Sequence, residues 1–84
     1  MREFEVSNEW SKAIDNATAT LLNESGSKGE LNEYIIKVHI GGTQPDETTT
    51  NFFNFYQGDT LNINEAKSVW VRKDDSNERK LVII

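Results

Sequence analysis

Short apolar segments alternate with polar clusters along the second half of this chain. The segments at 38–40, 52–56, 69–71 and 81–84 are largely apolar, and glycine or several polar residues follow each of the first three. This rhythm is typical of short β-strands joined by tight turns. The pattern therefore predicts a β-protein, and it leaves little chain for a separate catalytic layer.

The clearest predicted strand covers residues 31–40. Its even-numbered positions, among them Ile36 and Val38, are mainly apolar and fall on one face, whereas Lys37 and His39 fall on the other. Alternation of this kind predicts one face on the core and one face largely in water. Gly41 and Gly42 end the strand, and we expect them to form a turn that requires positive φ.

The first half is less regular. Residues 10–14 favour a short strand, with a helix over residues 8–15 as the alternative. Residues 17–22 alternate small and β-branched side chains, as a half-buried strand does. The polar segment 23–30 contains two glycines and predicts a long, mobile loop.

Four further strands are predicted at 52–56, 60–63, 68–72 and 80–84, with a short link at 64–67 and a polar hairpin loop at 73–78. The total is about six to eight short strands, at the spacing found in all-β sandwiches and small barrels. We therefore predict a single domain, residues 1–84, folded as a small antiparallel β-sandwich of the immunoglobulin-like or jelly-roll-like kind.

The composition of the chain limits the kinds of partner that it can bind. The net charge is −5, and the nine basic residues are scattered, which argues against a nucleic-acid partner. The longest apolar run, 81–84, is far too short to span a membrane. A chain of 84 residues without cysteine has few ways to gain stability other than oligomerisation. A homo-oligomer is therefore kept open alongside a monomer.

No constellation predicts catalysis. His39 is the only histidine, and no nucleophile or carboxylate lies beside it in the sequence, so we expect a surface strand residue. The acidic pairs Asp46-Glu47 and Asp74-Asp75 lack the spacing and glycine of a calcium loop and fit turns better. We predict no catalytic residue, no metal ligand, no cofactor and no enzyme activity.

The candidate binding surfaces consist of apolar residues. Five aromatic residues could form a sugar-stacking platform, although aromatic side chains at strand spacing more often belong to the core: Trp10, Phe52, Phe53, Tyr56 and Trp70. The final strand, 81–84, is apolar on both faces, so either both faces are buried or one meets another subunit. We take Trp70, Val82 and Ile84 as candidate protein-interface residues.

The order of these features resembles that of small structural proteins from the virions of tailed bacteriophages, over roughly residues 10–84. The features that carry the resemblance are the turn from Ile40 to Pro45, the turn from Gln57 to Leu61, the strand Val69–Arg72 and a final apolar strand. Such proteins are β-sandwich modules of capsid decoration, head fibres or tails, and they share no catalytic motif. The loop at 25–30 and the doubled glycine at 41–42 depart from the pattern.

The resemblance implies a non-enzymatic virion structural protein that binds capsid or tail subunits, most plausibly as a capsid decoration or head-fibre component. It also implies synthesis in the host cytoplasm and a final place in the virion. Two alternatives stay open: a carbohydrate- or receptor-binding module of a phage tail, and a small acidic inhibitor encoded by a phage.

Overall fold

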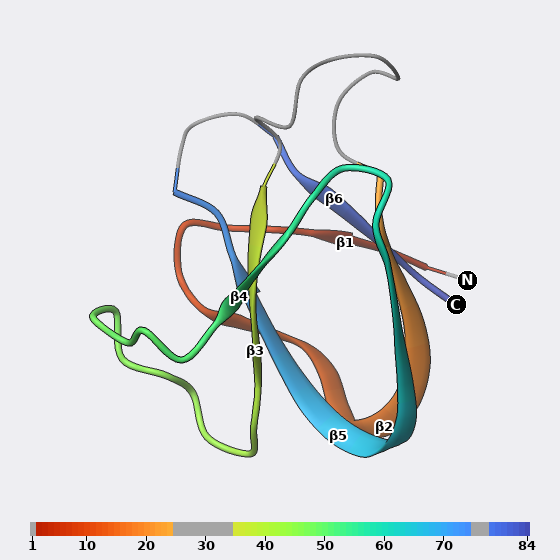
Figure 1. Ribbon diagram of the computed structural model, residues 1–84, viewed down its shortest axis with the longest axis horizontal. Coiled ribbons are helices and arrows are strands. Elements are labelled where there is room, and N and C mark those ends of the chain that lie inside the picture. Colours follow the sequence, from red (N-terminus) through yellow and green to blue (C-terminus); the bar gives the residue numbers. More distant parts are fainter. Residues whose placement is uncertain (1, 25–34, 75–77) are drawn as a thin grey trace.

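The computed structural model describes residues 2–24, 35–74 and 78–84. These residues form six β-strands and, within the described ranges, no helix (Figure 1). The strands are β1 (Arg2–Glu5), β2 (Ser11–Asn23), β3 (Ile36–Ile40), β4 (Phe53–Phe55), β5 (Thr60–Arg72) and β6 (Lys80–Ile83). The predicted all-β class is confirmed, and the helix alternative over residues 8–15 is wrong, because residues from Ser11 onward lie in β2.

All six strands belong to one antiparallel sheet with the order β1-β6-β2-β5-β3-β4. The sheet curls around the long, bent pair of strands β2 and β5 into a half-barrel (Figure 1). One end of this pair carries β6 and then β1, and the other end carries β3 and then β4. The expected sandwich of two sheets is therefore not confirmed.

The length of β2 and β5 differs from the prediction. Segments 10–14 and 17–22 were expected as separate strands, as were 60–63 and 68–72, but each pair is joined into one strand. The register of β2 against β5 shifts three times between Lys12 and Ala19. Bulges of this kind bend a strand without ending it. Residues 15–18 and 64–67 are exposed because the bent β2–β5 pair leaves the core there.

Asn16 marks the centre of this bend. Its φ of 50° places it in the left-handed region, which Asn tolerates better than most residues. Its backbone N–H donates a hydrogen bond to Ser68 Oγ at 3.1 Å, in place of a regular ladder partner. A side chain on β5 therefore satisfies the backbone donor that the bulge displaces.

The inner, concave face of the sheet holds the core, which every strand contributes to or contacts. Val38 and Val71 lie opposite each other and are fully buried. On the neighbouring strands β2 and β6, Leu21 and Leu81 are fully buried as well, and Leu21 lies opposite Ile83. The remaining core residues are Val6, Ala13, Ile14, Ile36, Phe55, Ile63, Val69 and Ile83. Burying one such large side chain contributes about 1.5–3 kcal/mol.

The strand predicted at 31–40 is confirmed where the structure describes it. Ile36 and Val38 are buried, whereas Lys37 and His39 are half-buried on the outer face. Residues 31–34 lie outside the described residues, and so does most of the loop predicted at 23–30. Of the hairpin loop predicted at 73–78, residues 75–77 lie outside them as well.

A second apolar cluster lies on the outer, convex face. Trp10 precedes β2 and is only 4% exposed, and its ring contacts those of His39 and Phe52 at centroid distances of 6.1 and 6.3 Å. Lys37 lies over the Phe52 ring and Arg72 over the Trp10 ring. The segment after β3 thus folds back over the sheet and covers part of its outer face.

The doubled glycine has a different cause from the one predicted. Neither Gly41 nor Gly42 has positive φ; among the described glycines only Gly58 does, at 86°. A Cβ on Gly41 would come within 2.9 Å of His39 Nε2, while one on Gly42 would meet nothing within 4 Å. A larger residue at position 41 would therefore crowd the His39 ring, and the positive-φ prediction is wrong for both glycines.

Asn23 links β2 to the edge strand β4 across the half-barrel. It is fully buried at the end of β2, and its side-chain Nδ2 donates to the Phe55 carbonyl oxygen of β4 at 2.8 Å. Its backbone also bonds the turn that follows β4, through Asp59 and Gly58. These hydrogen bonds hold the far end of β4 against β2, although the two strands are not neighbours in the sheet.

Candidate functional site

The structure brings two of the three predicted interface residues together. Val82 lies opposite Leu22 in the β6–β2 ladder, and Ile84 follows β6 opposite Thr20, with which it exchanges two backbone hydrogen bonds of 2.9 and 3.1 Å. Val82 is half-buried, and Ile84 is 63% exposed, the highest value among the exposed large apolar residues. Ile84 is therefore the side chain best placed to contact another molecule.

Trp70 lies elsewhere. It is on the outer face of the other half of the sheet, between Lys12 of β2 and His39 of β3. Its indole N–H donates to the Gly41 carbonyl oxygen at 3.0 Å, and Lys12 Nζ lies 5.0 Å from its ring centroid. These contacts belong to the protein's own fold, so the structure does not join Trp70 to Val82 and Ile84 in one surface.

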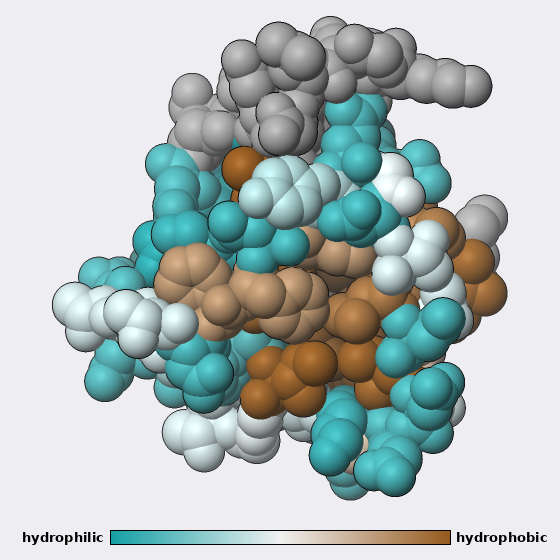
Figure 2. Space-filling view, in the orientation of Figure 1, coloured by the Kyte–Doolittle hydropathy of each residue, from teal (hydrophilic) through white to brown (hydrophobic). Residues whose placement is uncertain are grey.

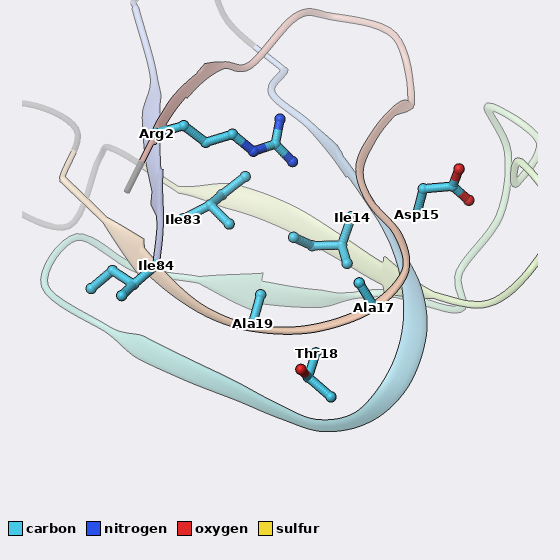
Figure 3. Close-up of a pocket in the computed structure, with 8 residues that line it drawn as sticks. All are labelled: Arg2, Ile14, Asp15, Ala17, Thr18, Ala19, Ile83 and Ile84. Atoms are coloured by element: carbon cyan, nitrogen blue, oxygen red, sulfur yellow. The ribbon is translucent and has the colours of Figure 1, made fainter.

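A hollow of about 540 Å³ adjoins Ile84, and we call it the β2–β6 hollow (Figure 3). It lies between β6 with the start of β1 on one side and the bulged middle of β2 on the other. Its lining is mainly apolar and consists of Arg2, Ile14, Asp15, Ala17, Thr18, Ala19, Ile83 and Ile84. Ile83 and Ile84 point in opposite directions from their strand, with Ile83 directed toward Arg2 and Ile14 (Figure 3).

The bulges in β2 create this space. Where β2 pairs with β6, from Leu21 to Asn23, the two strands are in regular contact. Toward Ala17 the bent strand follows β5 instead, and the small side chains of Ala17 and Ala19 leave the space unfilled. A second hollow of about 410 Å³ lies beyond Ile84, bordered by Thr20, Ile63 and Asn64. Ile84 thus forms an apolar ridge between two depressions.

Arg2 provides the cationic group of the β2–β6 hollow. Its Nη2 donates to the Ala13 carbonyl oxygen at 2.6 Å, which holds the guanidinium across the gap between β1 and β2. No ion pair joins Arg2 to a carboxylate in the described ranges, whereas Asp15 on the same rim pairs with Lys12 at 3.5 Å. The hollow therefore combines apolar walls with a guanidinium that has N–H donors left for a ligand.

The sequence analysis did not identify Arg2, Ile14 or Ala17 as site residues. Ile14 carries a pattern signal, but that signal indicates only burial. Arg2 stands between Met1 and Glu3, and nothing in the spacing shows that β1 lies beside β6. Only the pairing of Arg2 with Ile83, at opposite ends of the sequence, brings the guanidinium to this place.

A second exposed apolar region lies on the open side of the half-barrel. Ile40 and Phe53 are each 40% exposed, and a hollow of about 360 Å³ separates Ile40 from Asn62 and Lys67 of β5. Figure 2 shows apolar atoms gathered across this side of the molecule, over β3 and β4 and toward β5. This region is the margin of the core, because Phe53 and Ile40 lie opposite the buried Val38 and Val69.

The side chains that could catalyse a reaction or bind a metal make structural contacts instead. His39 Nδ1 lies 2.6 Å from the Asn51 carbonyl oxygen, and the ring also contacts Trp10. The Asp74 carboxylate pairs with Lys37 and with Arg72. Within the described ranges, no group of three or more histidine, aspartate or glutamate side chains gathers as a metal site would require.

The described residues also include no helix that is long and apolar enough to cross a membrane. Comparison with known proteins adds no relative: no family model, no curated protein and no solved structure matches this chain.

Proposed function

We propose that this chain is a non-enzymatic structural protein of a bacteriophage virion, which attaches to other virion proteins through the surface around Ile84. The bacteriophage assignment is supported by the order of turns and strands from Ile40 to the final apolar strand. The attachment surface is supported by the geometry of β6 and β2. Capsid decoration or a head fibre is the role that fits the resemblance best.

The observation that carries the proposal is the exposure of Ile84 on a rigidly held backbone. Both of its backbone hydrogen bonds go to Thr20, yet most of its side chain is in contact with water. Two hollows flank it, and half-buried Val82 lies two residues before it on the same strand. A fixed apolar ridge beside pockets has the form of an interface anchor, since binding energy concentrates in a few well-packed side chains.

The partners that follow from this proposal are capsid or tail subunits, with the virion as the final location. A homo-oligomer on the particle is compatible with the same surface. The carbohydrate-binding alternative has less support, because Trp10 is buried and the rings of Trp10 and Phe52 pack on each other. The Trp70 ring likewise contacts Lys12 of the same chain.

The test is particle binding by an Ile84→Asp variant. Because Ile84 is exposed, the substitution should change the free energy of unfolding by less than about 0.5 kcal/mol. Loss of an apolar anchor at the centre of an interface should weaken binding by roughly tenfold or more. Co-sedimentation with purified virions, together with thermal unfolding, measures both quantities.

The matched control is Ile40→Asp, which places the same change at an exposed isoleucine on the other half of the sheet. We expect this variant to sediment with particles as the unaltered protein does. If the protein is absent from purified virions and does not bind them, the proposed function is wrong. If both variants bind equally well, Ile84 is not the anchor.

A further inference from the structure

We propose that the β2–β6 hollow binds a segment of the partner protein in which an apolar side chain lies next to an aspartate or glutamate. The apolar side chain fills the space between Ile14, Ala17 and Ile83, and the carboxylate pairs with Arg2. This inference rests on the proposed function, since it assigns the chemistry of the partner at the same surface.

The apolar side chain of the proposed ligand follows from the residues that line the hollow. Small residues on β2 face larger ones on β6, so the hollow has room for an inserted side chain and apolar walls on both sides. The walls are rigid: Ile14 and Ile83 belong to the buried core, and the adjoining backbone is bonded between Thr20 and Ile84. A preformed apolar pocket loses little conformational entropy when it is filled.

The acidic residue of the proposed ligand follows from the charges at the hollow. The whole chain carries a net charge of −5, yet Arg2 at this hollow has no carboxylate partner in the described parts of the chain, and Asp15, which also lines the hollow, pairs with Lys12. The bond of Arg2 to the Ala13 carbonyl uses one N–H and fixes the orientation of the guanidinium. Arginine binds carboxylates with paired N–H donors, so its remaining donors favour an acidic ligand.

The bulges argue against simple addition of a strand at this place. Regular strand pairing requires an even row of backbone donors and acceptors, whereas β2 changes register three times here and Asn16 has positive φ. Bulged edges resist pairing with further strands. We therefore assign recognition to side chains: one apolar anchor and one carboxylate.

The experiment selects binders from a library of short linear peptides of random sequence, with the full chain as the target. We expect the selected peptides to place an aromatic or aliphatic residue next to Asp or Glu. Arg2→Gln should weaken their binding by roughly tenfold, because charge-assisted hydrogen bonds are lost. Arg2→Lys should restore part of it, and Ala17→Arg should block the hollow.

Two controls match these variants. Lys67→Gln removes a positive charge from β5, and Ala66→Arg adds the same bulk at an exposed β5 position; neither residue lines the hollow. Both should leave peptide binding unchanged. The inference is overturned if no peptide is selected, or if selected peptides bind Arg2→Gln and Ala17→Arg as tightly as the unaltered protein.

The two proposals can fail separately. Virion binding that depends on Ile84 but is unaffected by Arg2→Gln would leave the proposed function standing and overturn the assignment of the hollow. Peptide binding that depends on Arg2, together with absence of the protein from virions, would support the hollow and reject the virion role.

Discussion

The buried amide of Asn23 should be among the most sensitive positions in the protein. The substitution Asn23→Ala removes the 2.8 Å hydrogen bond to the Phe55 carbonyl oxygen and leaves that oxygen without this donor in a buried place. An unsatisfied buried acceptor costs about 1–3 kcal/mol. The space left by the amide group adds a cavity term of about 1 kcal/mol. We therefore expect a loss of about 2–4 kcal/mol.

That loss is large for a domain of this size. Stabilities of about 0.05–0.15 kcal/mol per residue imply roughly 4–13 kcal/mol for 84 residues. Each kcal/mol shifts the unfolding midpoint of a small domain by about 4–8 °C. The expected decrease in Tm is therefore roughly 8–30 °C, measured by circular dichroism or tryptophan fluorescence during heating.

Asn62→Ala is the matched control for this prediction. Asn62 also lies in a strand and also makes a side-chain hydrogen bond, since Thr20 Oγ1 donates to its Oδ1 at 2.9 Å, but it is exposed to water. Its replacement should cost less than about 0.5 kcal/mol. Equal midpoints for the two variants, or an Asn23→Ala variant as stable as the unaltered protein, would refute the reasoning.

Three further outcomes are expected. Gly41→Ala should lower the free energy of unfolding, measured in urea, by about 1 kcal/mol, because the added Cβ crowds the His39 ring. Gly42→Ala should be neutral or slightly stabilising, and the reverse order would contradict the contact. Leu81→Ala should cost about 2–5 kcal/mol by the same assay, and a smaller loss would mean that the core closes around the gap. Asp74→Asn should cost less than about 1 kcal/mol, and the loss should shrink in high salt, because this carboxylate is half-exposed; a salt-independent loss would count against an ion-pair origin.

The strand content of this protein could be predicted from local pattern, but the length of its strands could not. Residues 64–67 have the composition of a link, and residues 15–16 separate the two segments expected as strands. In the structure both stretches lie in the β2–β5 ladder, where Ala17 pairs with Lys67 and Ser68 Oγ accepts a hydrogen bond from the Asn16 backbone N–H. Pairing between segments distant in sequence decided the outcome, and single-segment propensity contains no information on it.

The candidate site, too, could be predicted only where local pattern decides the structure. Val82 and Ile84 were predicted together because a strand that is apolar on both faces needs a partner for one of them, and the structure places them near each other. Trp70 was a separate candidate and lies apart, since its hydrogen bond to Gly41 depends on a turn that its own segment does not encode. Arg2 could not be predicted at all, because its place depends on the pairing of β1 with β6.

The pairing of β1 with β6 also determines when this protein can finish folding. Among the described residues, β1 pairs with β6 alone, so residues 2–5 gain their strand partner only when residues 80–83 are available. Contacts of such long sequence separation slow folding, because the connecting chain must lose its entropy before they form. The β2–β5 pairing does not require β1, but Arg2 reaches the hollow only after β1 is in place. The surface around Ile84, with its hollow, is therefore complete only when β1 and β6 have paired.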